Sequence, residues 1–272
     1  MESHVHSLFD SGEFYDEAVY RFHHELYGLL LLELDAQAVV PLNFAEVFEE
    51  AAKSLDVIYC QKAGARVTAL LELLEKAQEL SDEIYDRIWD VNEARLAGEA
   101  VELDRVREAE KKLLSVFKME QDRFVRLNWA DEVLFPEEAA QNHLYYIRKA
   151  VRSLKRKNLE TALEALYEID NNAYAFQFSR SVYEHFTDYV FHQEPDRLQW
   201  GAGRIVHHEN LYDLVEGLLE KYRRGETEVR EEILRLEAVE KRQQAYLKED
   251  VDYMIKSTEK MLLILQEAKE LL

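Results

Sequence analysis

The segment 226–272 carries an apolar repeat that constrains the fold more than any other feature. Its apolar residues recur at alternating steps of three and four, which is the spacing of one face of an α-helix. Only Gln243 and Thr258 interrupt that face, which consists of Val229, Ile233, Leu236, Val239, Leu247, Val251, Met254, Met261, Leu265 and Leu272. A straight helix of this length would span roughly 70 Å, longer than a compact bundle needs. We therefore expect it to pack on a projecting helical hairpin or to form a partner interface.

A charged helical hairpin is expected in the middle of the chain. The region 44–96 is helical in pattern but too long for one unbroken helix, and Gly64 is a suitable place for a break. A further helix is predicted over 101–127. Within residues 62–120 the apolar positions form a narrow stripe between many charges, a pattern that favours an antiparallel hairpin projecting from a more compact body.

The remaining segments are also helical in pattern. An amphipathic helix is predicted from about Asp16 until Pro41 breaks the pattern, and Pro136 and Asn158 mark the starts of two later helices. The aromatic-rich run 174–191 is expected to belong to the core. With only three prolines and eight glycines in 272 residues, the sequence predicts an all-α fold, a helical bundle with a long hairpin and a long C-terminal helix.

The charge balance narrows the function classes. The chain has 34 basic and 55 acidic residues, a formal net charge of −21, and such a surface repels nucleic acid and anionic lipid. Its single cysteine, Cys60, excludes an internal disulfide and suits a reducing compartment. The apolar run Leu29–Leu32 is too short for a membrane span, and no secretory signal opens the chain. We expect a cytoplasmic protein without nucleic-acid or membrane partners.

The segment 195–213 differs from its helical surroundings. It combines a helix-ending Pro195 with a tryptophan and two glycines, before a helix restarts near Asp213. Gly201 and Gly203 permit positive φ and close approach of a backbone or a ligand. Loops of this composition between rigid elements often carry function, although a plain helix–helix connection with a buried tryptophan fits as well.

No complete active site is recognisable from motifs. A di-iron bundle needs Glu-x-x-His, and no histidine here has an acidic residue three positions before it. The pairs His24–Glu25 and His208–Glu209 lack the second histidine of a zinc-protease helix. Adjacent histidines such as His207 and His208 point about 100° apart on a helix, so they rarely bind one ion together. A Walker loop and a G-x-S-x-G serine motif are absent from the sequence.

Three separated motifs nevertheless resemble one family in their order and spacing. The chain opens with H-S-L-F-D at His6–Asp10 and F-Y-D at Phe14–Asp16; L-E-L-D…V-V-P-L-N-F follows at Leu32–Phe44, and W-G-A-G-R-I-V-H-H-E-N-L-Y-D at Trp200–Asp213. These motifs resemble the end of the catalytic domain and the helical C-terminal domain of the family-28 zinc metallopeptidases, the group of aminopeptidases, glutamate carboxypeptidase and the transferrin receptor.

The resemblance implies a role for each motif. Residues 1–15 would be the remnant of a catalytic domain, with His6 as its terminal zinc ligand, and 16–272 would be a transferrin-receptor-like dimerisation domain. The late loop would face the substrate with Trp200, Gly201, Gly203, Arg204 and Tyr212. The family's other zinc ligands and general base belong to an α/β domain that this sequence lacks, and one histidine cannot hold a catalytic zinc. Zinc is thus expected only in the intact peptidase.

Two functions from different classes remain open. In the first, the chain is a non-catalytic helical domain that forms a homodimer and completes the substrate pocket of a zinc aminopeptidase when joined, in cis or in trans, to the catalytic part. In the second, it is a stand-alone acidic helical adaptor without peptidase function. A weaker third option is metal binding by His4, His6 and Asp10.

Overall fold

The computed structural model describes residues 16–192 and 203–272 and confirms the all-α fold. The helices of the first half are α1 (Glu17–Ala36), α2 (Ala45–Lys53), α3 (Val57–Ala63), α4 (Val67–Leu96) and α5 (Leu103–Arg123). A two-stranded antiparallel hairpin, β1 (Arg126–Leu127) and β2 (Val133–Leu134), separates them from the rest. The second half contains α6 (Glu138–Lys155), α7 (Leu159–Tyr167), the 3₁₀ turn η2 (Asn172–Phe176), α8 (Arg180–Phe191), α9 (Tyr212–Arg224) and α10 (Arg230–Leu271).

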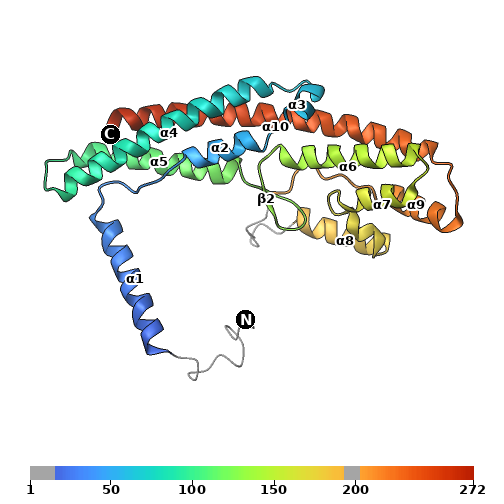
Figure 1. The fold of residues 1–272 in the computed structure, drawn as a ribbon, viewed down its shortest axis with the longest axis horizontal. Helices are drawn as coiled ribbons and strands as arrows, with labels where there is room; N and C mark the ends of the chain where they lie inside the picture. The colour runs from blue at the N-terminus through green and yellow to red at the C-terminus, as the bar shows by residue number, and fades with distance from the viewer. Residues whose placement is uncertain (1–15, 193–202) are drawn as a thin grey trace.

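The long C-terminal helix α10 is the element on which the bundle is built. It packs against α3, α4, α5 and α6, and Figure 1 shows it running the length of the molecule. The expected hairpin corresponds to α4 and α5, which both lie along α10, so the first of the two expectations for the C-terminal helix is confirmed. Gly64, the expected break, ends α3 with φ +70°, a conformation that glycine adopts without steric cost.

Two apolar cores lie one after the other along α10. The first joins α2, α4 and α5 to α10 from Leu247 onwards, with Phe48, Leu74 and Leu247 fully buried. The second joins the end of α6 to α7, α8, α9 and the start of α10, with Leu166, Tyr183 and Leu236 at its centre. The apolar stripe of α6 changes partner between Leu144 and Ile147, which belong to different cores.

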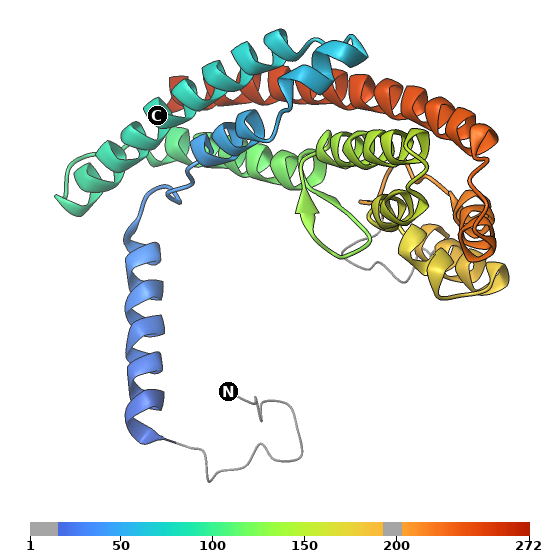
Figure 2. The same cartoon turned by 45° about the vertical axis from the view of Figure 1, so that its right-hand side comes forward.

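Helix α1 stands away from both cores. None of its residues is buried, and Figures 1 and 2 show it projecting from the end of the connecting segment. That segment is anchored to the bundle: Oδ1 of the buried Asn92 accepts the N–H groups of Ala38 and Val39, and its Nδ2 donates to the Val39 carbonyl. Within the described chain, no helix is both long enough and apolar enough to cross a membrane.

Candidate functional site

The loop in the segment 195–213, expected to face a substrate, is described only from Gly203 onwards. Gly203 has φ +71° and open space around the position of a Cβ atom, consistent with the turn expected there. Trp200 and Gly201 lie outside the described residues, and so does His6, the expected zinc ligand. The structure therefore places two of the expected loop residues besides Gly203, namely Arg204 and Tyr212.

Arg204 fastens this loop to the end of α5. Its Nη1 donates to the carbonyl oxygens of Gln121 and Val125, the latter at 3.1 Å, and its Nη2 lies 3.5 Å from Asp122. The Arg204 carbonyl accepts the N–H of Leu127 at 3.3 Å. A cation at the C-terminal end of a helix satisfies carbonyls that have no partner within the helix. In the structure, the guanidinium is thus engaged inside the chain.

Tyr212 is buried where α9 begins. Its hydroxyl donates to the Phe178 carbonyl at 3.0 Å, its ring lies 5.1 Å from that of Tyr183, and the Arg180 guanidinium sits 5.3 Å from its ring centre. Burial raises the pKa of the Tyr212 hydroxyl above its ordinary value. These contacts tie α8 to α9. A substrate-facing role for Arg204 and Tyr212 stays a prediction.

A polar turn after α7 organises the centre of the second half. Asp170 has φ +54°, a conformation that aspartate and asparagine tolerate better than other side chains. Asn171 accepts the Tyr183 hydroxyl at 2.7 Å and donates to Thr187 at 2.8 Å. Asn172 donates to the Glu209 carbonyl and accepts the N–H of Leu211. The turn therefore links α7 to α8 and to the segment that precedes α9.

The two adjacent histidines bind two different carboxylates. Nε2 of His207 is 2.9 Å from Oδ1 of Asp250, and the ring stacks on Tyr246 at 4.1 Å. Nδ1 of His208 is 2.7 Å from Oδ2 of Asp170, and because a carboxylate only accepts, Nδ1 carries the proton. No group of three histidine, cysteine or acidic side chains among the described residues is arranged to hold a metal ion.

A buried line of polar side chains joins this turn to α6 through α10. The Glu209 carboxylate accepts from Arg242 at 2.6 Å and from Nε2 of Gln243 at 3.2 Å. Oε1 of Gln243 accepts from Nδ1 of His143 at 3.2 Å. Burial lowers the pKa of His143, so its imidazole is neutral at physiological pH. Gln243, which interrupts the apolar face of α10, is fully buried as the link between the two ends of this line.

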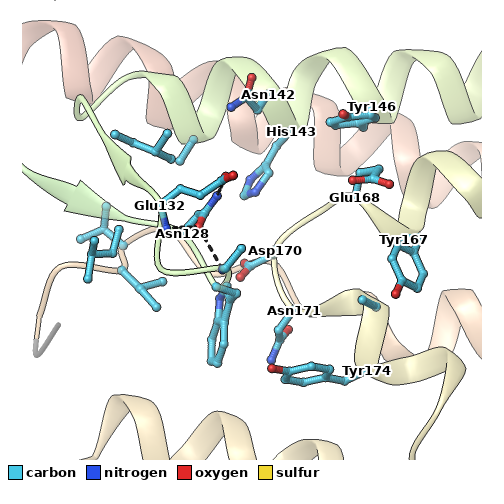
Figure 3. A pocket seen from close by; sticks show the side chains of 18 residues that line it. Asn128, Glu132, Asn142, His143, Tyr146, Tyr167, Glu168, Asp170, Asn171 and Tyr174 are labelled. Atoms are coloured by element: carbon cyan, nitrogen blue, oxygen red, sulfur yellow. Dashed lines mark hydrogen bonds between the residues drawn. The ribbon is translucent and has the colours of Figure 1, made fainter. Parts of the chain in front are cut away.

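A pocket of about 470 Å³ opens between the β1–β2 loop, the first half of α6 and the turn after α7. We call it the α6 pocket. Figure 3 shows His143 entering it from α6 and Asp170 facing it from the turn. Asn128 and Glu132 of the β1–β2 loop and Glu168 contribute further polar side chains to its wall. The aromatic side chains that line it are Trp129, Tyr146, Tyr167 and Tyr174.

One carboxylate oxygen of Asp170 has no partner in the part of the chain that the structure describes. The Asp170 side chain is 3% exposed, and its Oδ2 accepts from His208 and from the N–H of Glu209. Its Oδ1 is buried and has no hydrogen-bond partner among the described residues, and the same holds for Nε1 of Trp129. A buried carboxylate oxygen without a partner costs free energy, and native proteins usually supply a partner or bound molecule. Asp170 is the strongest candidate binding residue of the described chain.

Comparison with known proteins adds no relative, because no family model, curated protein or solved structure matches this chain. The α6 pocket was not predicted from the sequence, since its walls come from segments far apart in the chain. The available signals were the connector that contains Trp129 and the irregularity after α7. Neither indicates that the two segments meet.

Proposed function

We propose that this chain is the helical, non-catalytic part of a zinc-dependent aminopeptidase-like protein, and that α1 packs against the α/β catalytic part. The observation that carries the proposal is the exposure of α1. Each of its ten large apolar side chains is between 46% and 68% exposed, and no residue of the helix is buried. They are Val19, Tyr20, Phe22, Leu26, Tyr27, Leu29, Leu30, Leu31, Leu32 and Leu34.

The breadth of the apolar surface supports a large partner. With successive residues about 100° apart, every one of these side chains except Leu32 falls within an arc of about 200° centred on Leu30. A coiled-coil seam is much narrower, and a surface helix usually buries an arc little above 100°. A helix with so broad an apolar arc suits the face of an α/β sheet, where other helices flank it.

The charges of α1 do not suit a membrane surface. The helix contains Glu17, Glu25, Glu33 and Asp35 but only one basic residue, Arg21. Helices that lie on anionic lipid are rich in lysine and arginine on the polar face. A protein partner is therefore the better occupant of the apolar arc.

The resemblance of the sequence motifs to the family-28 zinc metallopeptidases suggests which protein partner to test. The residues before α1 resemble the end of a peptidase catalytic domain, so the chain would enter α1 directly from that domain. On the other side, the connecting segment is held by Asn92 and by the buried Val39 and Phe44, so α1 is attached firmly at its C-terminal end. A helix held in this way and covered by the catalytic part would join the two parts.

The test is co-purification of the chain with the polypeptide encoded directly upstream of it. We expect that polypeptide to be an α/β domain with paired zinc carboxylates, to bind the chain and to supply all the peptidase activity. Leu30→Glu, at the centre of the apolar arc, should abolish binding. Leu32→Glu is the matched control, since Leu32 is also exposed, at 68% against 51% for Leu30, but lies on the opposite side of the helix, and should leave binding unchanged.

The outcomes separate the proposal from its alternatives. Peptidase activity of the chain alone, or equal effects of the two substitutions, would contradict the proposal. Sedimentation that shows a dimer of the isolated chain, sensitive to Leu30→Glu, would identify a second copy as the occupant of α1. A stand-alone adaptor is favoured by the internal bonds of Arg204 and Tyr212, and binding to an upstream polypeptide without a zinc site would support it.

A further inference from the structure

The described lining of the α6 pocket is acidic, and His208, whose Nδ1 lies 2.7 Å from Oδ2 of Asp170, offsets the Asp170 charge only when it is protonated. Glu132, Glu168 and Asp170 contribute carboxylates, whereas the described lining residues include no lysine and no arginine. His143 is neutral because burial lowers its pKa. The carboxylate of Glu132 already accepts from Nδ2 of Asn128 at 2.6 Å, but Oδ1 of Asp170 accepts from no group in the described structure.

Asp170 distinguishes this pocket from an ordinary acidic patch. Its side chain is only 3% exposed, and hydrogen bonds from His208 and from the backbone N–H of Glu209 fix its position. Both bonds go to Oδ2, so the second oxygen is held rigidly at the pocket wall (Figure 3). A preorganised acceptor in a partly desolvated site favours a charged donor.

The aromatic walls favour the same kind of ligand. Trp129, Tyr146, Tyr167 and Tyr174 line the pocket together with the carboxylates. The faces of such rings attract organic cations, and they also pack against alkyl chains. A volume of about 470 Å³ lies within the range of small-molecule sites. A metal ion fits less well, because the described residues offer no cluster of three ligands.

We propose that the α6 pocket binds a small organic ammonium ion, with its ammonium group on Oδ1 of Asp170 and its alkyl chain against the tyrosine rings. An ammonium group has three N–H donors and no acceptor, which matches an unpartnered carboxylate oxygen. A second ammonium would meet Glu168 at the more exposed edge of the pocket. This proposal concerns residues of the helical part alone and does not depend on a peptidase partner.

The test is isothermal titration calorimetry of the full chain with putrescine at pH 7 in 150 mM NaCl. Both amines of putrescine are protonated at that pH, and 1,4-butanediol is the neutral analogue of the same length. We expect putrescine to bind and the diol not to bind. Asp170→Asn keeps the shape and the tolerance for φ +54° but removes the charge, and should weaken putrescine binding at least about tenfold.

Two further variants keep the test independent of folding. Glu168→Gln, at the exposed edge, should weaken binding about threefold, as expected for loss of one partly screened charge. Glu164→Gln removes the same charge from α7 outside the pocket and should leave binding unchanged. The proposal fails if the diol binds as well as putrescine, if folded Asp170→Asn binds normally, or if Glu164→Gln weakens binding as much as Glu168→Gln.

Discussion

Helices α1 and α10 carry the same kind of apolar pattern but have opposite surroundings. In α10, fourteen of its 42 residues are buried, from Glu232 to Ala268, and the helix packs against four others. In α1, none of 20 residues is buried. The comparison teaches that apolar periodicity identifies a helix that needs a partner, while the presence of that partner depends on the rest of the protein.

The largest expected contrast is between equivalent leucines of the two helices. Leu247→Ala in α10 should lower the free energy of unfolding by about 3 kcal/mol, because Leu247 is fully buried and its removal leaves a cavity. Leu30→Ala in α1 should change it by less than about 0.5 kcal/mol, because Leu30 is 51% exposed. Urea unfolding of both variants measures the contrast, and similar losses would mean that α1 is packed in the isolated chain.

The stability of the bundle around α10 should also depend on pH. Burial raises the pKa of Glu137 from the ordinary 4.5 to about 8, so the folded chain binds its proton more tightly than the unfolded chain does. The stabilisation is complete below pH 4.5 and is lost as the pH rises through 8. Between these pH values the Glu137 carboxyl should lower the free energy of unfolding by about 3 kcal/mol, and we expect Glu137→Gln to remove this pH-dependent loss. Unfolding curves at pH 5 and pH 8 test this, and an unchanged difference between the two curves would contradict it.

The two polar interruptions of the α10 face should behave differently from each other. Gln243→Leu should destabilise the chain by about 2 kcal/mol, because it leaves the buried His143 and Glu209 without this partner. Thr258→Val should be neutral or stabilising, since Oγ1 of Thr258 is buried and no described residue hydrogen-bonds to it. Thermal unfolding of the two variants measures this difference. Equal losses of stability in both would show that Gln243 acts only by filling space.

A smaller loss of stability than for Leu247→Ala or Gln243→Leu is expected where α1 joins the bundle. Asn92→Ala should lower the unfolding free energy by about 1.5 kcal/mol, because it leaves the N–H groups of Ala38 and Val39 and the Val39 carbonyl without their partner. It should also increase exchange of the Ala38 and Val39 amides while leaving α10 protected. Loss of protection throughout α10 would show that Asn92 supports the whole bundle.

Periodicity and helix-ending residues predicted most of the fold. The long C-terminal helix, the break at Gly64 and the helix start at Asn158 are confirmed, because each follows from local backbone chemistry. The prediction that the aromatic run after residue 174 is core was wrong for most of α8: Tyr183 is buried, but Phe186 and Tyr189 are 45% and 49% exposed. Aromatic content alone does not reveal which face of a helix has a neighbour.

The candidate site was less predictable for a related reason. The α6 pocket is lined by Trp129, His143 and Asp170, which lie in three different segments, and a spacing pattern within one helix does not reveal that such segments meet. Arg204 and Tyr212 were predicted from their loop to face a substrate, yet their observed contacts are with Val125 and Phe178. Short motifs locate unusual residues, and the packing decides which groups those residues meet.

Hydrogen exchange of the α1 amides, followed with and without the upstream-encoded polypeptide, tests the central proposal most directly. In the chain alone we expect α1 to exchange within seconds, because none of its residues is buried and most helical stability in proteins comes from tertiary packing, while α10 stays protected for far longer. Adding the polypeptide should protect α1 selectively, and Leu30→Glu should prevent that protection. If α1 is already as protected as α10, or if the polypeptide binds without protecting α1, the proposal that α1 joins the two parts is contradicted.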